Sequence, residues 1–348
     1  SIGGPAKGTL VREIDALGGV MGIIADKTTL QMKMLNKSKG PAVRALRAQS
    51  DKIEYPREML SLLKRTKHLD LKEAYVKELM VKNQRVSGVI LESGETIESK
   101  TVIVTTGTFM NAKIMVGDHS WLEGPDKQKA SIGLSDHLRK LGHQTFRLKT
   151  GTPARLKVNS IDTSKMDLSS GDGFIHHFSH ELEHLRVLDK EWPCYLIHTQ
   201  PKTHEIIHLN LSKSAMYGGQ TVDGVGPRYC PSIEDKLVRF SDKERHQLFI
   251  EPESRFLDEV YLQGFSTSMP HDVQEEMIHS LPGLEHAKIS KYAYAIEYDA
   301  IDARTLWPSL ESKLVDGLFF AGQVNGTSGY EEAAAQGLMA GINATLKL

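Results

Sequence analysis

Hydrophobic and polar residues follow a helical spacing in some parts of the chain and a strand-like spacing in others. From Gly8 to Leu17 the apolar residues share one helical face, and Gly18-Gly19 is placed to end that helix. A second helix is predicted over Val273 to Leu281, with Pro282-Gly283 behind it. Strands are predicted where apolar residues alternate or run together: Leu71 to Val81, Arg85 to Glu92 after an Asn83-Gln84 turn, Thr101 to Thr105, and His204 to Leu211.

The C-terminal segment carries the most informative pattern. Leu318 to Ala321 predicts a short buried strand, and a helix rich in small residues is predicted from Tyr330. The turn between them carries three glycines: Gly322, Gly326 and Gly329. A strand, a glycine turn and a helix N-terminus bring backbone N–H groups close to an anionic or electron-rich ligand. A tightly packed corner without a ligand would show the same pattern.

One stretch of the chain is basic. Thr28 to Ser50 has no acidic residue and carries five cations: Lys33, Lys37, Lys39, Arg44 and Arg47. Pro41 is placed to open a helix there, and Pro56 to kink or end it. Such a stretch is a candidate contact for the phosphates of a dinucleotide or of RNA, and a solvated helix face is the alternative.

Composition narrows the class of protein. The 348 residues suffice for two domains, or for one domain with an insertion. The net charge of -1 gives no global field for nucleic acid, and no apolar run approaches the ~18 residues of a membrane span. Two cysteines form no disulfide framework, which favours a reducing compartment. The chain opens at Ser1 inside a glycine-rich motif, so we expect a piece of a longer protein.

Two kinds of side chain are candidates for chemistry. Cys230 lies between Pro227 and Pro231, and Arg228 and Lys236 would favour its thiolate, the nucleophilic form. A buried structural cysteine is the alternative, and it is the interpretation favoured for Cys194, beside Trp192 and Tyr195. The spacing of His176, His180 and His184, with Asp172 nearby, is compatible with zinc, but no Cys-x-x-Cys accompanies it and a histidine patch without metal is favoured. The helix dipole alone explains Glu331 and Glu332 in a first helical turn.

Five motifs together resemble one family. They are Ser1 to Gly19, Met34 to Arg44, Lys149 to Pro153, Gly226 to Lys236 and Phe320 to Gly326, and they closely resemble the MnmG (GidA) family in the same order along the chain. The resemblance implies an α/β fold of the two-dinucleotide-binding, glutathione-reductase-like FAD type with an inserted α+β domain. It implies a first part of the FAD-binding domain at 1–150, an inserted NAD or substrate domain at 151–298 and a second FAD-binding part at 299–348.

The same resemblance implies an activity. Members of the family add a carboxymethylaminomethyl or aminomethyl group to carbon 5 of the wobble uridine of tRNA. They work with the GTPase MnmE in a heterotetramer and form a homodimer. They use FAD, NAD(H) and methylenetetrahydrofolate as the one-carbon donor. A cytoplasmic location and no membrane association are expected.

The resemblance also assigns residues. Val76, Ser131 and Gln323 would contact FAD, and Cys230 would add to uridine C6 to activate C5. The segment that matches the family's NAD site comprises Gly226, Pro227, Arg228, Tyr229, Cys230, Pro231, Ser232, Ile233, Glu234, Asp235, Lys236, Leu237, Val238, Arg239 and Phe240. No metal site is implied.

The chain also departs from the family pattern. The Gly-x-Gly-x-x-Gly strand that binds the FAD pyrophosphate and the Cys-Asn-Pro before the first motif are absent, as is the C-terminal helical domain. We therefore expect the fragment alone to bind FAD poorly and to be inactive. Two other classes remain open: a two-dinucleotide flavin oxidoreductase acting on a small molecule, and a non-enzymatic RNA-binding scaffold.

Overall fold

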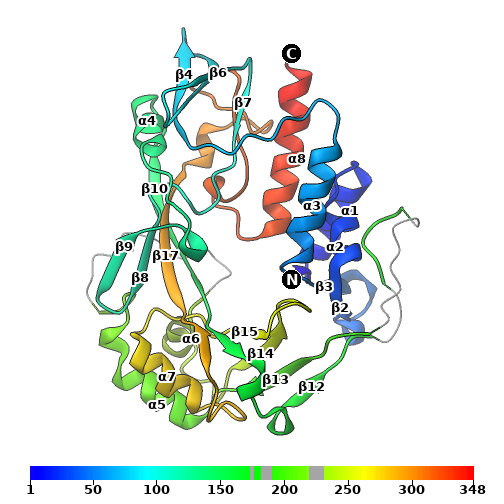
Figure 1. The fold of residues 1–348 in the computed structure, drawn as a ribbon, viewed down its shortest axis with the longest axis vertical. Coiled ribbons are helices and arrows are strands. Elements are labelled where there is room, and N and C mark those ends of the chain that lie inside the picture. Colours follow the sequence, from blue (N-terminus) through cyan, green and yellow to red (C-terminus); the bar gives the residue numbers. More distant parts are fainter. Residues whose placement is uncertain (173–175, 182–189, 219–230) are drawn as a thin grey trace.

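Two long antiparallel strands connect the two halves of the molecule. The computed structural model describes residues 1–172, 176–181, 190–218 and 231–348. Strand β10 (Thr145–Thr152) pairs with β17 (Tyr294–Ile301) along its whole length, and both run from the upper half to the lower half in Figure 1. Strands β8 (Lys113–Val116) and β9 (His119–Leu122) extend this sheet in the order β10-β17-β8-β9.

The N-terminal elements form one layer of the upper half. A small sheet has the order β1-β3-β2, and helices α1, α2 and α3 accompany it. Their bounds are β1 Ile2–Gly3, α1 Lys7–Ala16, α2 Met21–Thr28, β2 Thr29–Leu35, β3 Ala45–Ser50 and α3 Glu54–Arg65. The last helix, α8 (Tyr330–Leu346), lies beside α1 and packs Ala334, Ala335 and Leu338 against the same apolar core.

The rest of the upper half surrounds a parallel strand pair. Strands β7 (Val102–Val104) and β18 (Leu318–Phe320) are far apart in sequence but pair in parallel. A three-stranded antiparallel sheet and one helix pack against them: β4 Val76–Lys82, β5 Arg85–Leu91, β6 Thr96–Glu98 and α4 Leu134–Lys140.

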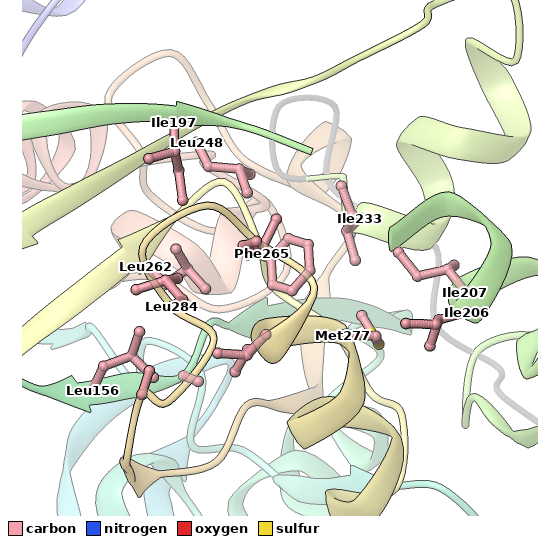
Figure 2. Close-up of a cluster of buried hydrophobic side chains, with 14 of the residues drawn as sticks. Leu156, Ile197, Ile206, Ile207, Ile233, Leu248, Leu262, Phe265, Met277 and Leu284 are labelled. Carbon is pink, nitrogen blue, oxygen red and sulfur yellow. The ribbon is translucent and has the colours of Figure 1, made fainter. Parts of the chain in front are cut away.

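The lower half has its own core. Six strands form a sheet in the order β12-β13-β14-β15-β11-β16, covered by three helices. Their bounds are β11 Arg155–Lys157, β12 Asp167–Ser169, β13 Cys194–His198, β14 Gln247–Pro252, β15 Glu259–Gln263, β16 Ile289–Lys291, α5 Pro201–Leu209, α6 Ile233–Arg239 and α7 His271–His279. Figure 2 shows Phe265 and Met277 in this core, with Ile233 of α6 reaching into it.

Short 3-10 turns complete the described structure. They are Lys37–Lys39, Pro41–Val43, Pro125–Lys127, Val158–Ser160, Thr163–Lys165, Leu211–Lys213, Ala303–Thr305 and Gly322–Asn325. Across the described ranges, no helix is both long enough and apolar enough to cross a membrane.

Several predicted elements are confirmed and three are wrong. The helices near Gly8 and Val273, and the hairpin with positive φ at its Asn83-Gln84 turn, are present. The strand predicted from His204 is instead part of helix α5, because Pro201 starts a helix whose Gln200 and Thr203 form a capping box.

The two proline predictions in the basic stretch also fail. Pro41 opens only a 3-10 turn, and the arginines after it lead into strand β3 rather than along a helix. Pro56 neither kinks nor ends a helix, because it lies in the first turn of α3, where a missing N–H breaks no helical hydrogen bond.

Candidate functional site

The parallel strand pair brings two turns to one edge. Phe320 of β18 lies opposite Val104 of β7, and Ala321 N donates to Val104 O at 3.0 Å. Thr106 therefore follows β7 at the same edge where the Gly322–Asn325 turn follows β18. In open α/β sheets, ligands bind outside the carboxyl ends of the parallel strands, so this edge is the candidate site.

Buried polar atoms without partners gather at this edge. Thr106 Oγ1, Asn325 Oδ1 and Thr327 Oγ1 are buried and make no hydrogen bond with any part of the chain that the structure describes. An unsatisfied buried polar atom costs about 1–3 kcal/mol, so such atoms call for a bound group that completes them. Gly322 and Gly326 have φ of +86° and +79°, a backbone conformation that favours glycine.

The glycine turn is held in place by side chains that the sequence patterns did not single out. Tyr298 of β17 is fully buried, and its hydroxyl accepts a hydrogen bond from Gln323 Nε2. Asn325 Nδ2 donates to Phe320 O at 2.8 Å, and Gln336 Oε1 accepts from Gly322 N at 2.9 Å. Tyr298 comes from a strand distant in sequence, so no local pattern could reveal its contact with Gln323.

The start of α8 is tied to the start of α1. Glu331 is buried and accepts a hydrogen bond from Gly3 N at 2.6 Å, while Lys7 Nζ lies 3.5 Å from its other oxygen. Lys7 Nζ also lies 3.0 Å from Glu332. The helix dipole is therefore not the whole explanation of these carboxylates, since they also fix the first glycine motif against the C-terminal helix.

Ser131 and the start of β4 lie next to the Thr106 turn. Ser131 N donates to Phe109 O at 2.8 Å, and Phe109 N donates to Thr106 O at 3.1 Å. A Cβ added to Gly133, two residues after Ser131, would lie 3.6 Å from Cγ of Lys77, which follows Val76 in β4. The structure thus brings Ser131 close to the candidate edge and places the start of β4 beside the same loop.

The predicted nucleophile and part of the predicted NAD segment lie outside the described residues. Gly226 to Cys230 belong to that part, and the description resumes at Pro231. Ser232 then caps α6 and forms a capping box with Asp235, with both hydrogen bonds at 3.1 Å. Three residues of this helix are buried in the lower core: Ile233, Glu234 and Leu237. The ammonium of Lys236 is bound to Gly264 O at 2.7 Å.

The Lys149 motif connects this helix to the glycine turn. A Cβ on Gly326 would lie 3.7 Å from Cδ1 of Leu148 in β10. The next residues, from Lys149 to Gly151, line a small cavity of about 20 Å³ together with Ser232 and Asp235. Side chains alternate between the faces of a strand, so Lys149 and Leu148 point to opposite faces of the connecting sheet. The glycine turn and the cap of α6 therefore both lie against β10. The turn is next to Leu148, and the cap is next to the residues that follow it.

The remaining candidates have structural surroundings. Cys194 is buried, and burial raises the pKa of its thiol to about 12, which confirms the interpretation as core packing. His176 Nε2 lies 3.3 Å from Asp172. Among the residues the structure describes, which exclude His184, no group of three side chains could hold a metal ion.

Comparisons with known proteins agree along the whole chain. The family model described as "Glucose inhibited division protein A" matches residues 1–348. The protein named tRNA uridine 5-carboxymethylaminomethyl modification enzyme MnmG is 58% identical over 348 residues in Acholeplasma laidlawii, where the match covers 100% of this chain and 56% of that protein. In Bacillus subtilis the protein of the same name is 53% identical over 347 residues, and the match covers 55% of it.

A solved structure shares the fold. GidA of Aquifex aeolicus in its form I crystal has a TM-score of 0.94 and 48% identity, and the match covers 99% of this chain and 58% of that one. This likeness confirms the predicted fold class, a two-dinucleotide-binding α/β fold with an inserted α+β domain. The chain spans about half the length of the curated relatives it matches.

Proposed function

The chain belongs to the family described as glucose inhibited division protein A, and we propose that it forms the catalytic core of a tRNA-modifying flavoenzyme. The longer protein would add a carboxymethylaminomethyl or aminomethyl group to carbon 5 of the wobble uridine. The relatives that carry the name tRNA uridine 5-carboxymethylaminomethyl modification enzyme support this proposal, since they match the whole chain at more than half identity.

The two halves would divide the work. Residues 1–150 and 299–348 would form the FAD-binding domain, and residues 151–298 the inserted domain for NAD or substrate. The separate apolar core of the lower half supports this division, because a domain needs its own core. The connecting strands β10 and β17 would then be the junction between the domains.

The candidate edge fits FAD. Its three unpartnered oxygens, the positive-φ glycines and the nearby start of α8 are features that a polar, electron-rich cofactor would satisfy. Val76, Ser131 and Gln323 would hold it, with Gln323 kept in place by Tyr298. When bound, the flavin would supply two-electron redox chemistry. NAD(H) would be the reductant, and methylenetetrahydrofolate the one-carbon donor.

Cys230 would be the nucleophile. Its thiolate would form a bond to uridine C6, and the electron pair of the C5=C6 double bond would move towards C5 and the C4 carbonyl. Carbon 5 would then attack the methylene carbon of the folate donor as the bond from that carbon to one folate nitrogen breaks. Loss of the proton on carbon 5 with departure of the sulfur would restore the double bond. The amine of glycine or ammonium would take the place of the second folate nitrogen, which releases tetrahydrofolate. The capped helix immediately after Pro231 supports this role by giving the segment a fixed end.

The partners of the longer protein follow from the same proposal. They are tRNA as substrate, the GTPase MnmE in a heterotetramer, and a second copy in a homodimer. A cytoplasmic location is proposed because tRNA is the substrate.

The unpartnered Thr327 hydroxyl is the observation that carries the flavin proposal, and it can be tested directly. Thr327→Val in the full-length protein removes this hydroxyl at nearly constant volume. We expect flavin affinity to fall roughly tenfold, as for the loss of one hydrogen bond of about 1.4 kcal/mol. The cofactor-free protein should become no less stable, because an unsatisfied group has been removed. Thr345→Val, on the exposed end of α8, is the matched control.

Two results would contradict the proposal. Unchanged flavin affinity of the Thr327→Val protein would show that the hydroxyl does not face the cofactor. Wobble-base modification in an assay with tRNA and MnmE should disappear in a Cys230→Ala protein, and modification retained by that protein would remove the nucleophile assignment.

A further inference from the structure

The basic stretch divides into two groups in the structure. Lys33 in β2 donates a hydrogen bond to Ser169 Oγ at 3.1 Å, and Arg47 in β3 forms an ion pair with the buried carboxylate of Glu251. Both cations lie within strands and are held by the lower half of the molecule. Their role is therefore to attach the β2–β3 hairpin to its surroundings.

The other cations lie at the hairpin tip, which we define as residues 36–44. Two consecutive 3-10 turns form this tip, and every residue from Lys37 to Lys39 and from Pro41 to Arg44 is exposed. Hydrogen bonds fix its shape: Asn36 Nδ2 donates to Val43 O at 3.1 Å, and Arg44 Nη2 donates to Lys37 O at 3.3 Å. The hairpin tip is therefore a built loop rather than a solvated run of charges.

The charge of the hairpin tip is mostly uncompensated. Lys37 pairs with Asp172, but Lys39 and Arg44 form no ion pair with any carboxylate among the described residues. The hydrogen bond from Arg44 Nη2 to Lys37 O, at 3.3 Å, holds the Arg44 guanidinium against the turn that carries Lys39. Val43 is 48% exposed between them and offers an apolar surface beside the charges.

The hairpin tip is linked by a short strand to the candidate edge. Arg47 of β3 pairs with Gly3, whose N–H donates to Glu331 at the start of α8. Arg44 precedes Arg47 by three residue steps of extended chain, a distance of about 10 Å. The hairpin tip is therefore connected through β3 and β1 to the start of α8, the helix that follows the glycine turn.

We propose that the hairpin tip binds backbone phosphates of tRNA, with Lys39 and Arg44 as the contacting cations. This inference rests on the proposed function and names the surface that receives its substrate. Clustered cations with an exposed apolar residue suit the phosphates and sugars of a folded RNA. A dinucleotide phosphate has the same chemistry, so the experiment measures flavin binding alongside tRNA binding.

The test compares two double variants of the full-length protein. Lys39→Ala with Arg44→Ala removes both exposed cations of the hairpin tip. Lys64→Ala with Arg65→Ala removes the same charge from the exposed last turn of α3, a helix of the same N-terminal layer. tRNA affinity is measured from 50 to 200 mM salt, together with flavin content and thermal midpoint.

The plot of log affinity against log salt concentration has a negative slope. We expect this slope to become shallower by about 1 for each tip cation removed. Each lost contact then makes binding about 3.5-fold less sensitive to this fourfold rise in salt. Lys39→Arg with Arg44→Lys should restore most of the slope, because the charge is kept. The α3 variant should retain the wild-type slope, and flavin content should not change.

Three results would overturn the inference. A wild-type slope in the tip variant would show that no phosphate binds there, and an equal drop in the α3 variant would indicate a general charge effect. Loss of flavin with unchanged tRNA binding would assign the hairpin tip to a dinucleotide. If the unaltered full-length protein binds no tRNA, the proposed function fails, and the tip proposal fails with it.

Discussion

Asp299→Asn should destabilise the junction between the two halves. Asp299 lies in β17, next to Tyr298, and is only 4% exposed. Its carboxylate accepts hydrogen bonds from Asn111 Nδ2 at 2.8 Å, Arg147 Nη1 at 2.9 Å and the Ser135 hydroxyl. Asparagine has nearly the same shape, but its amide presents donors where three donors already converge.

The expected cost is large because both charge and hydrogen bonds are buried. Breaking a buried ion pair by removing one partner costs about 3–5 kcal/mol of folding stability. We expect a cost near the lower limit of this range for Asp299→Asn, because Arg147 is partly exposed. Asp302→Asn is the matched control, three residues further along the chain. Asp302 pairs with Arg304, which is 89% exposed, so solvent screens this pair and its loss should cost far less than the loss of the Asp299 carboxylate.

The assay is urea unfolding of both variants followed by circular dichroism, at several pH values. Burial alone would raise the pKa of Asp299, but hydrogen bonds from Ser135, Arg147 and Asn111 lower it overall. A lowered folded-state pKa gives stability that is present above the unfolded value of about 3.9 and lost as pH falls through the folded value. The gap between wild type and Asp299→Asn should therefore stay constant from pH 7 to pH 5 and close below about pH 4. Equal shifts for Asp299→Asn and Asp302→Asn at pH 7 would refute the reasoning.

Three further predictions use other parts of the structure. Cys194, whose thiol pKa burial raises to about 12, should resist alkylation at pH 8 until the protein is unfolded, and rapid labelling of the folded protein followed by mass spectrometry would contradict this. Burial lowers the pKa of His143, so the folded protein should lose stability as pH falls below the unfolded pKa of about 6.5. In a His143→Gln protein the free energy of unfolding, measured by urea titration, should fall less steeply with falling pH than in wild type, by up to about 1.4 kcal/mol per pH unit. Ser232→Ala should cost about 1 kcal/mol by removing the cap of α6, while Ser232→Asp should keep most of it; equal thermal midpoints for alanine and wild type would show that the cap contributes nothing.

Local patterns predicted the elements whose signals agree with their final environment. The small-residue helix from Tyr330 and the strand before it have residue types that favour one conformation wherever the chain places them. The prediction failed for His204 to Leu209, where the apolar pair Ile206-Ile207 suits a strand and a helix equally well. Two features favour the helix: Pro201 starts it, and the lower core buries both isoleucines on its inner face.

The candidate site was only half predictable for a related reason. Its glycine turn was visible because glycine adopts positive φ at the least steric cost, and Gly322 and Gly326 both have positive φ. The contacts of Gln323 with Tyr298 and of Glu331 with Gly3 join residues far apart along the chain, and only the folded sheet brings them together.

Sequence alone determined the family resemblance, the element types of the strongly patterned segments and the position of the glycine turn, because these depend on residue type and local spacing. Tertiary structure decided which cations of the basic stretch are bound internally and which are exposed, since charge in a sequence carries no information about its partners. It also decided that the turns carrying Thr106 and Asn325 follow two strands that end at one edge, because parallel pairing aligns β7 and β18, which are distant in the chain.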